Sequence, residues 1–361
     1  MYLYKRAIQL FLAISIISIC LSSCSESQRK GFEIKNMAIG KAGSVLVVAE
    51  DYLWEGTLGD TVRGQLAQSF GVLPQEEPTF DIKHVTGEKF KGFNRELRAI
   101  VLLAVLPDGK ETSRAIAELL GPERIQKAKN DPNYTTIMLD DLWSKGQKIF
   151  IFFGQNEAQL TEAFSKRQQT VINTINELDK KQLNATNYQS GKNKLLNQKI
   201  QEDLGFSITL PGNYELAIYD SLSQAIWVRK ETGSTSNNIL IHTIPYTDQN
   251  QLTRENLIAE RDSLGRQFIT SAAEDAYMLT DKKNLGIQYK EQEINGNFAI
   301  QAQGLWKMHN DFMGGPFSSY LIHDKEGGKL VFVDGFIHAP GKPKRPLIQQ
   351  IDLIIKSLTF K

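Results

Sequence analysis

The sequence predicts an α+β fold with two domains, each a mainly antiparallel sheet with helices packed on it, joined by a long helical segment. Short apolar or alternating runs recur along the chain, as they do in strands. Between them lie stretches with apolar residues three or four positions apart, which are typical of helices packed on sheets. The 361 residues also exceed the range of about 50–250 residues in which single domains usually fall.

The first domain is expected over residues 36–155. Continuous apolar runs predict buried strands, and Gly71 and Pro74 mark the end of the first helix. The strands are expected at 44–49, 79–85, 99–106, 134–139 and 147–153, and the helices at 58–70, 112–120 and 122–129.

A helical connector is expected over residues 156–205. Asn156 is a suitable N-cap for a long amphipathic helix over 157–183. A second helix over 192–204 is expected to end at Gly205. The long helix either serves as a lever or packs its apolar stripe on its own sheet.

The second domain is expected over residues 206–361. Strands follow one another at hairpin-like intervals, with an evident turn over 324–328. They are expected at 206–210, 214–219, 225–230, 238–243, 277–280, 286–294, 298–308, 317–323 and 329–337, and helices at 253–264 and 347–358.

Residues 1–23 have the organisation of a secretory signal. Lys5 and Arg6 precede an apolar run over 7–19, which is shorter than the roughly 20 residues that span a bilayer. Small residues then lead to Cys24. An uncleaved signal anchor, or a secretory signal with a chance cysteine, is the alternative.

This segment resembles bacterial lipoprotein signal peptides, in which Leu21, Ser22 and Ser23 would form the lipobox before Cys24. The resemblance implies that Cys24 is diacylated and becomes the mature N-terminus, so that the membrane is a partner through the lipid. Two or three acyl chains anchor stably. Residues 24–35 are then a short tether with a reach of about 17–20 Å.

Charge and cysteine content exclude several classes of protein. Loss of residues 1–23 changes the formal net charge from +1 to −1, whereas a nucleic-acid partner requires a basic excess. The only cysteines are Cys20 and Cys24, so the predicted mature fold has no thiol for a disulfide, a nucleophile or a metal.

The motifs of common enzymes are missing. The sequence has no G-x-S-x-G, and the G-x-x-x-x-G over 87–92 lacks the Lys-Ser/Thr of a phosphate loop. The five histidines lack the spacing of a zinc helix, and we expect neither a metal nor a cofactor: His84, His242, His309, His323 and His338. Carboxylate pairs for hydrolysis stay open, because they are usually assembled from distant segments.

One stretch, over 306–320, combines aromatic residues with two glycines and a proline between predicted strands. A loop of this kind can present a ligand or partner surface, here made of Trp306, Phe312, Phe317 and Tyr320. The alternative is that these aromatic residues cap the core.

Two family resemblances involve larger parts of the chain. The F-x-I-x-L-P opening at 206–211, the helix in the middle of the domain and the strand-loop-helix ending over 331–360 resemble the PsbP-like α/β/α sandwich. The whole chain, from L-S-S-C to the terminal helix, resembles an uncharacterised family of Bacteroidota envelope lipoproteins, a domain of unknown function. This second resemblance implies an envelope membrane. It also implies that this membrane is the outer one. Surface display in that group is associated with acidic residues just after the lipidated cysteine, whereas Ser25 to Lys30 contains one acid and two bases, so we expect the periplasmic face.

These observations predict a non-catalytic envelope lipoprotein that binds or scaffolds close to the membrane, with an envelope protein as a possible partner. Two alternatives remain. One is a periplasmic hydrolase that uses carboxylates, and the other is a carrier of hydrophobic cargo, which requires an enclosed apolar cavity.

Overall fold

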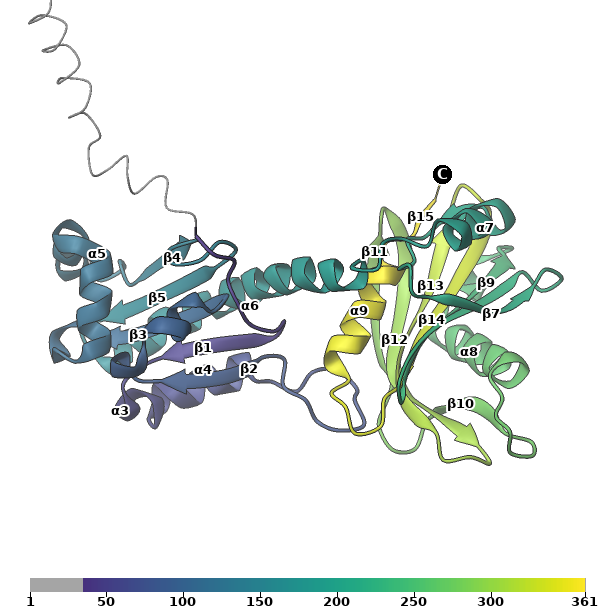
Figure 1. Ribbon diagram of the computed structural model, residues 1–361, viewed down its shortest axis with the longest axis horizontal. Helices are drawn as coiled ribbons and strands as arrows, with labels where there is room; N and C mark the ends of the chain where they lie inside the picture. Colours follow the sequence, from purple (N-terminus) through teal and green to yellow (C-terminus); the bar gives the residue numbers. More distant parts are fainter. Residues whose placement is uncertain (1–34, 361) are drawn as a thin grey trace, which may run out of the picture.

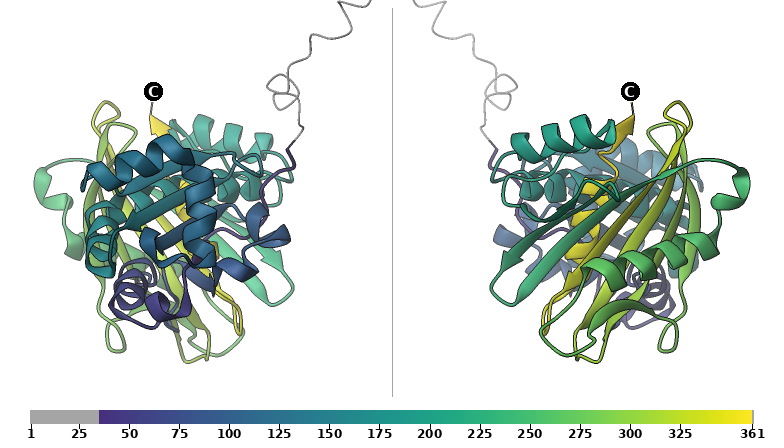
Figure 2. Two further views of the ribbon diagram at one scale, coloured as in Figure 1. Left: turned by 90° about the vertical axis from the view of Figure 1, so that its left-hand side faces the viewer. Right: turned by 90° about the vertical axis from the view of Figure 1, so that its right-hand side faces the viewer.

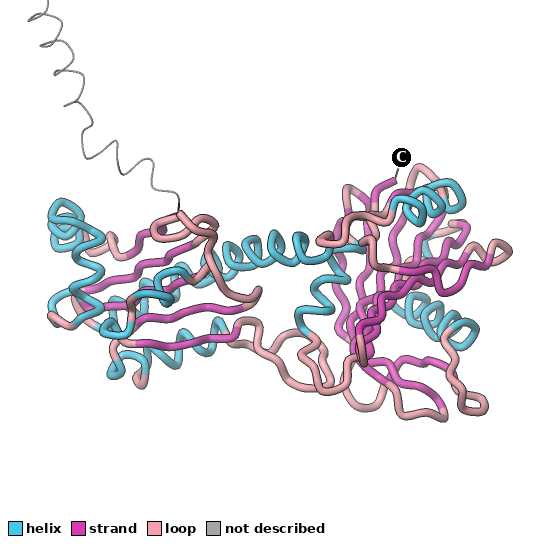
Figure 3. The backbone as a smooth tube through the Cα atoms, in the orientation of Figure 1, coloured by secondary structure: helices cyan, strands magenta, loops and turns pink. Residues whose placement is uncertain are grey.

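A computed structural model describes residues 35–360 of the chain. Two sheet-containing domains lie next to each other along the longest axis of the molecule, and the helix α6 (Glu157–Asn187) runs from one to the other (Figure 1). Figure 3 shows this helix as the only long rod between the two groups of strands in the described part of the chain.

The first domain has a five-stranded sheet in the order β2-β1-β3-β5-β4. The first four of these strands are parallel to one another, and only β4 is antiparallel to its neighbour β5. The bounds are β1 (Ser44–Val48), β2 (Asp81–Val85), β3 (Ala99–Val105), β4 (Thr136–Asp140) and β5 (Lys148–Gly154). The prediction of a mainly antiparallel sheet is therefore wrong for this domain. β1, β3 and β5 are continuous apolar runs because helices cover both faces of the sheet, as is usual for parallel strands.

Helices lie on both faces of this sheet. α3 (Asp51–Trp54), α4 (Thr57–Leu66) and the first part of α6 enclose one apolar cluster with it, and α5 (Glu111–Asn130) encloses the other. α5 is kinked at Gly121, whose φ is +70°, before Pro122. Three short 3₁₀ turns connect elements of this domain: η1 (Gly87–Lys89), η2 (Gly92–Glu96) and η3 (Leu106–Asp108).

The second domain is organised around an antiparallel sheet of eight strands. Seven follow one another in the order β10-β12-β13-β14-β9-β8-β7, and β11 pairs with β12 beside β10. The bounds are β7 (Glu215–Asp220), β8 (Ala225–Thr232), β9 (Thr235–Pro245), β10 (Tyr277–Asp281), β11 (Gln288–Ile294), β12 (Asn297–His309), β13 (Gly314–Asp324) and β14 (Lys329–His338). A separate short pair joins β6 (Phe206–Ser207) to β15 (Thr359–Phe360).

This sheet also has a helical layer on each face. α7 (Lys194–Leu204) and α9 (Arg345–Ile355) pack on one face, and α8 (Arg254–Phe268) lies across the other, as Figure 2 shows. A 3₁₀ turn, η4 (Gln249–Gln251), precedes α8. The predicted α+β class is confirmed, and the second sheet is antiparallel as predicted.

The long helix has 31 residues, which correspond to about 46 Å at 1.5 Å per residue. Leu160, Phe164 and Val171 in its first half belong to a core cluster of the first domain. Its far end packs on α9 of the second domain, where the Asn187 side chain donates to the Gln350 carbonyl. The same helix is therefore part of one domain and a support for the other. Among the described residues, no helix is both long and apolar enough to cross a membrane.

Candidate functional site

The four aromatic residues predicted as a surface do not form one. Phe312 is fully exposed, whereas Trp306, Phe317 and Tyr320 are at most 4% exposed. The loop is shorter than predicted, because β12 continues to His309 and β13 begins at Gly314. Trp306, Phe317 and Tyr320 therefore lie within strands β12 and β13, and their side chains are buried in the domain. The Trp306 indole donates to the Ile337 carbonyl at 3.0 Å, so it has a structural partner.

Cys24 and the residues Leu21, Ser22 and Ser23 before it lie outside the described residues. Between residues 35 and 360, no group of three or more His, Cys, Asp or Glu side chains is placed to hold a metal ion.

In three places two carboxylates are adjacent in the sequence, at Glu50-Asp51, Glu76-Glu77 and Asp140-Asp141, and at least one of each two has a structural partner. Glu50 accepts hydrogen bonds from the backbone and hydroxyl of Thr112, at the start of α5. Asp140 pairs with Lys148. Glu77 accepts from the backbone N–H groups of the residues that begin α9.

A cavity of about 710 Å³ lies between the two domains. Residues 70 and 71 and α6 contribute to it from the first domain, and β11, β12 and α9 contribute from the second. We call it the interdomain cleft. Its lining is rich in side-chain amides, each of which carries a donor and an acceptor: Asn173, Asn176, Gln288, Gln301, Gln303 and Gln349.

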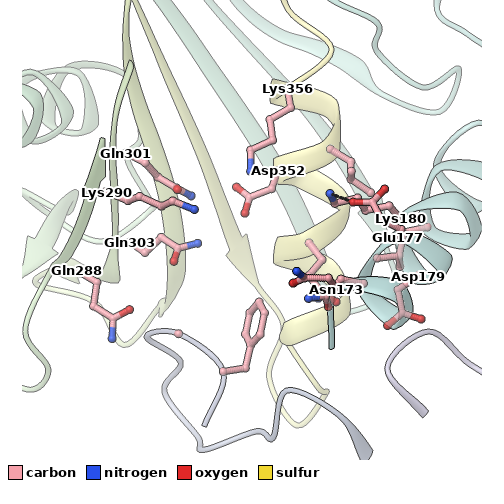
Figure 4. A pocket seen from close by; sticks show the side chains of 16 residues that line it. Asn173, Glu177, Asp179, Lys180, Gln288, Lys290, Gln301, Gln303, Asp352 and Lys356 are labelled. Atoms are coloured by element: carbon pink, nitrogen blue, oxygen red, sulfur yellow. Dashed lines mark hydrogen bonds and ion pairs between the residues drawn. The ribbon is translucent and has the colours of Figure 1, made fainter. Parts of the chain in front are cut away.

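The β11–β12 hairpin forms one wall of the cleft. Its register pairs Gln288 with Gln303 and Lys290 with Gln301, so these four side chains stand on one face of the sheet. Figure 4 shows them pointing from the strands toward α9, while Asp352 points from α9 back toward them. The same face is apolar farther along the sheet, where α9 and α7 cover it.

A hydrogen-bonded network fixes the groups at the base of this wall. The buried Tyr320 hydroxyl donates to Oδ1 of Asp352 at 2.9 Å and accepts from Nε2 of Gln301 at 2.8 Å. The same Nε2 donates to Ser318 at 2.9 Å, and Gln292 donates to Oε1 of Gln301 at 2.7 Å. The carboxylate of Asp352 is thus held in place from the sheet.

Burial raises the pKa of the Asp352 carboxyl, and the charge of Lys356 and the hydrogen bonds from Ser318 and Tyr320 oppose this shift. Burial also raises the pKa of the Tyr320 hydroxyl, with a further contribution from the charge of Asp352. Asp352 can act as a hydrogen-bond acceptor when ionised and as a donor when protonated.

Two other acidic residues on the cleft lining have partners. Glu177 pairs with Lys180 along α6. Asp179 pairs with the buried guanidinium of Arg98 and accepts from the Gly43 N–H at 2.8 Å. Asp352 is therefore the lining carboxylate without an ion-pair partner within 4 Å among residues 35–360.

Two lysines of the cleft also lack such a partner. Lys290 comes from β11 and Lys356 follows α9, and neither forms an ion pair with another described residue. Figure 4 shows both ammonium groups directed toward the region of Asp352. Together with the single unpaired carboxylate, they give this part of the cleft an excess of positive charge.

Of the predicted site residues, only Tyr320 takes part in this cleft, and it does so from beneath the surface. The amides of the cleft were not among the predicted site residues, although the sequence contains a pattern that indicates them. Gln288, Lys290 and Gln292 alternate in one strand, Gln301 and Gln303 alternate in the next, and an Asn-Gly turn joins the strands. Such a turn fixes the hairpin register, so the pairing could have been worked out from the sequence.

Comparisons with known proteins assign the two halves of the chain separately. Residues 193–357 match the family model of a domain of unknown function, DUF4837, and residues 38–188 match that of a second one, DUF8532. No curated protein matches the chain.

Two solved structures illustrate the structural likeness. The Saccharomyces cerevisiae Ran-binding protein Mog1p has a TM-score of 0.28, and a mutant of protein Mog1 has one of 0.27. Each is 11% identical in sequence, and each alignment covers 43% of this chain and 89% of the other. The predicted likeness to the PsbP-like sandwich stays a prediction.

Proposed function

We propose that this protein is a lipid-anchored protein of the cell envelope that binds a polar ligand in the interdomain cleft without catalysis. The observation that carries the binding role is the cleft itself. A cavity of about 710 Å³ is within the range of small-molecule sites, about 300–1,000 Å³. Its amides come from four separate elements, α6, β11, β12 and α9, and line a common space.

The anchor rests on the order of basic residues, apolar run and L-S-S-C at the start of the sequence. We propose that Cys24 carries the lipid and that the protein is held at the outer membrane, facing the periplasm. Replacing Cys24 by alanine is then expected to move the protein from the membrane fraction to the soluble fraction. Wild-type protein found in the soluble fraction would contradict the anchor.

The chemistry of the cleft favours a polar ligand over the two alternatives. A carrier of hydrophobic cargo requires an enclosed apolar cavity, whereas this cleft is open and polar atoms make up about half of its lining. Hydrolysis by paired carboxylates requires a second carboxylate able to act with the first. Glu177 and Asp179 are both engaged with cations, which leaves Asp352 alone.

The binding role can be tested in cells without knowledge of the ligand. A photoreactive benzoylphenylalanine in place of Asn173, an exposed residue of α6 on the lining of the cleft, reports on the cleft, and the same group in place of the exposed Gln126 on α5 is the matched control. We expect irradiation to yield a discrete adduct by mass spectrometry only from position 173. Equal labelling at both positions, or none at either, would contradict a binding role for the cleft.

A further inference from the structure

We infer that the ligand of the interdomain cleft is a saccharide that carries a carboxylate and is about the size of a disaccharide. This inference rests on the binding role proposed above and adds the chemical class of the ligand. It follows from four features of the cleft: the direction of the wall, its free amides, its charge and an aromatic ring on its lining.

The side chains that line the cleft stand on the face of a sheet, although β11 pairs with a strand on one side only. Gln288 and Gln303 are a cross-strand pair, and the backbones of β11 and β12 pair with each other throughout this wall. An extended peptide is commonly recognised by adding a strand to a free edge. Here the recognition groups are side chains, which suits a ligand with its own donors and acceptors spread around a ring.

Several amides are free to bind such groups. Among the described residues, the side chains of Asn176, Gln288, Gln303 and Gln349 make no hydrogen bond to another part of the protein. A side-chain amide offers two donors and an oxygen acceptor. Hydroxyl and acylamino groups of a sugar also combine donors with acceptors, and a site built to bind them rejects analogues that lack them.

The charges near Asp352 favour an anionic substituent. The Lys290 and Lys356 ammonium groups come from opposite walls and have no ion-pair partner among the described residues. A carboxylate placed between them would gain charge-assisted hydrogen bonds. The carboxylate of Asp352, held by Tyr320, is then a fixed acceptor for a neighbouring hydroxyl.

Apolar atoms make up about half of the surface of the lining. Phe70, Leu183 and Leu353 contribute to it, and Phe70 comes from the first domain although it packs against the core of the second. An aromatic ring of this kind can cover the C–H face of one sugar ring. A lipid chain would cover the amides and ammonium groups of the lining without giving them hydrogen-bond partners, which is unfavourable.

The test uses the full lipidated protein in detergent and isothermal titration calorimetry with three probes. The first is the disaccharide N-acetylglucosaminyl–N-acetylmuramic acid, which carries a carboxylate. The second is N,N′-diacetylchitobiose, which is a neutral disaccharide of the same kind. The third is the tripeptide Ala-Ala-Ala, which has amides and a carboxylate but no sugar ring.

We expect the acidic disaccharide to bind at least about tenfold more tightly than the neutral one, as expected for a charge-assisted contact. Lys290→Gln and Lys356→Gln should each reduce this difference, and Gln303→Ala should weaken both sugars. Lys325→Gln, in an exposed turn outside the cleft, should change neither.

Four results would overturn the inference. Tighter binding of the tripeptide, with loss of that binding in Gln303→Ala, would replace the saccharide by a peptide and leave the cleft as the site. Absence of binding by all three probes, with the photo-adduct at position 173 retained, would refute the saccharide alone. Absence of both would refute the binding role as well. Equal affinity for the two sugars would remove the carboxylate from the proposed ligand.

Discussion

Arg261 of α8 and Asp334 of β14 form an ion pair whose side chains are both completely buried. The guanidinium lies over the Phe317 ring at 3.9 Å from its centre and donates to the Thr280 hydroxyl, and Ser319 donates to Asp334. The pair thus ties α8 to the middle of the sheet. Phe317, predicted as a surface residue, is needed inside the domain for this contact.

We predict that Asp334→Ala lowers the free energy of unfolding by about 3–5 kcal/mol, because it leaves a buried guanidinium without its counter-ion. The double variant Arg261→Met/Asp334→Leu is expected to lose clearly less, since no unpaired charge remains. Chemical denaturation followed by tryptophan fluorescence measures both. A single variant that is as stable as the double one would show that the pair has no such role.

Asp352 provides a prediction about pH. Burial raises the pKa of its carboxyl above that of the unfolded chain. The folded state therefore binds the proton more tightly, and the stability that results is complete at low pH and is lost as the pH rises through the folded-state pKa. We expect Asp352→Asn to be more stable than the wild type at neutral pH, with the difference vanishing in acid, as measured by urea denaturation across pH.

Asp311 gives a control of opposite sign. Hydrogen bonds from the Ser271 hydroxyl and the Phe312 N–H lower the pKa of its carboxyl, so its contribution to stability is present at neutral pH and is lost on acidification. Asp311→Asn should therefore not raise the free energy of unfolding at neutral pH. If both variants change the free energy of unfolding in the same direction at neutral pH, burial does not determine how Asp352 affects stability.

At the scale of elements, the β11–β12 hairpin shows how much of the site the sequence contained. Both strands were predicted, and the turn between them is Asn295-Gly296, with φ of +48° and +83°. Such a turn sets the pairing of two strands without any tertiary information. The amide face of the hairpin was therefore predictable from local rules.

The rest of the cleft was not predictable in this way. Asp352 lies on the amphipathic helix α9. Whether its side chain reaches the cleft depends on how closely α9 approaches the sheet. At Gly335 of β14 a Cβ would lie 2.1 Å from Cγ2 of Ile351, so the helix can come this near only because that residue is glycine. Contacts of this kind join segments distant in sequence, so they cannot be predicted from the spacing of apolar residues along one helix or strand.

The start of α9 depends on the other domain. Its N-cap residue, Lys344, makes no side-chain cap, and Glu77 of the first domain supplies one. The carboxylate accepts from the N–H of Lys344 at 2.6 Å and from that of Arg345 at 3.0 Å. A negative group at a helix N-terminus is also favoured by the helix dipole.

We predict that Glu77→Ala destabilises the first turn of α9 by about 0.5–2 kcal/mol, the usual range for loss of a cap. Hydrogen exchange should then be faster at the first amides of this helix, with little change at its C-terminal end. The neighbouring Glu76 is exposed and makes no such contact, so Glu76→Ala is the matched control. Unchanged exchange in Glu77→Ala would show that the cap does not hold the helix.

For the whole molecule, the sequence predicted two sheet-containing units with a long helix between them. It did not predict their mutual orientation, nor the parallel strands of the first sheet. Both depend on pairing between distant segments. The sequence did contain an indication of parallel strands. The apolar runs at β1, β3 and β5 lack the alternation of apolar and polar residues that is typical of strands with one exposed face.

The orientation of the domains depends in part on Arg345. This buried residue of the second domain donates to the carbonyls of Pro78 and Thr79 and to Oδ2 of Asp81, all in the first domain. Its guanidinium also lies against Gly43, where a Cβ would be 2.7 Å from Nη2. The interdomain cleft is lined from both domains, so its shape depends on this contact.

We predict that Arg345→Ala broadens the distribution of distances between the domains, because the loss of several buried hydrogen bonds costs about 1–3 kcal/mol or more. Spin labels at Gln126→Cys and Leu222→Cys, one exposed site in each domain, measure the distribution by pulsed electron spin resonance in a Cys20→Ser/Cys24→Ser background. Lys342 is an exposed residue of the same loop, and Lys342→Ala should leave the distance distribution narrow. If Arg345→Ala leaves it narrow too, α6 alone is stiff enough to hold the cleft, and Arg345 only stabilises it. If the distribution broadens, loss of this one side chain should also weaken any ligand that contacts both walls.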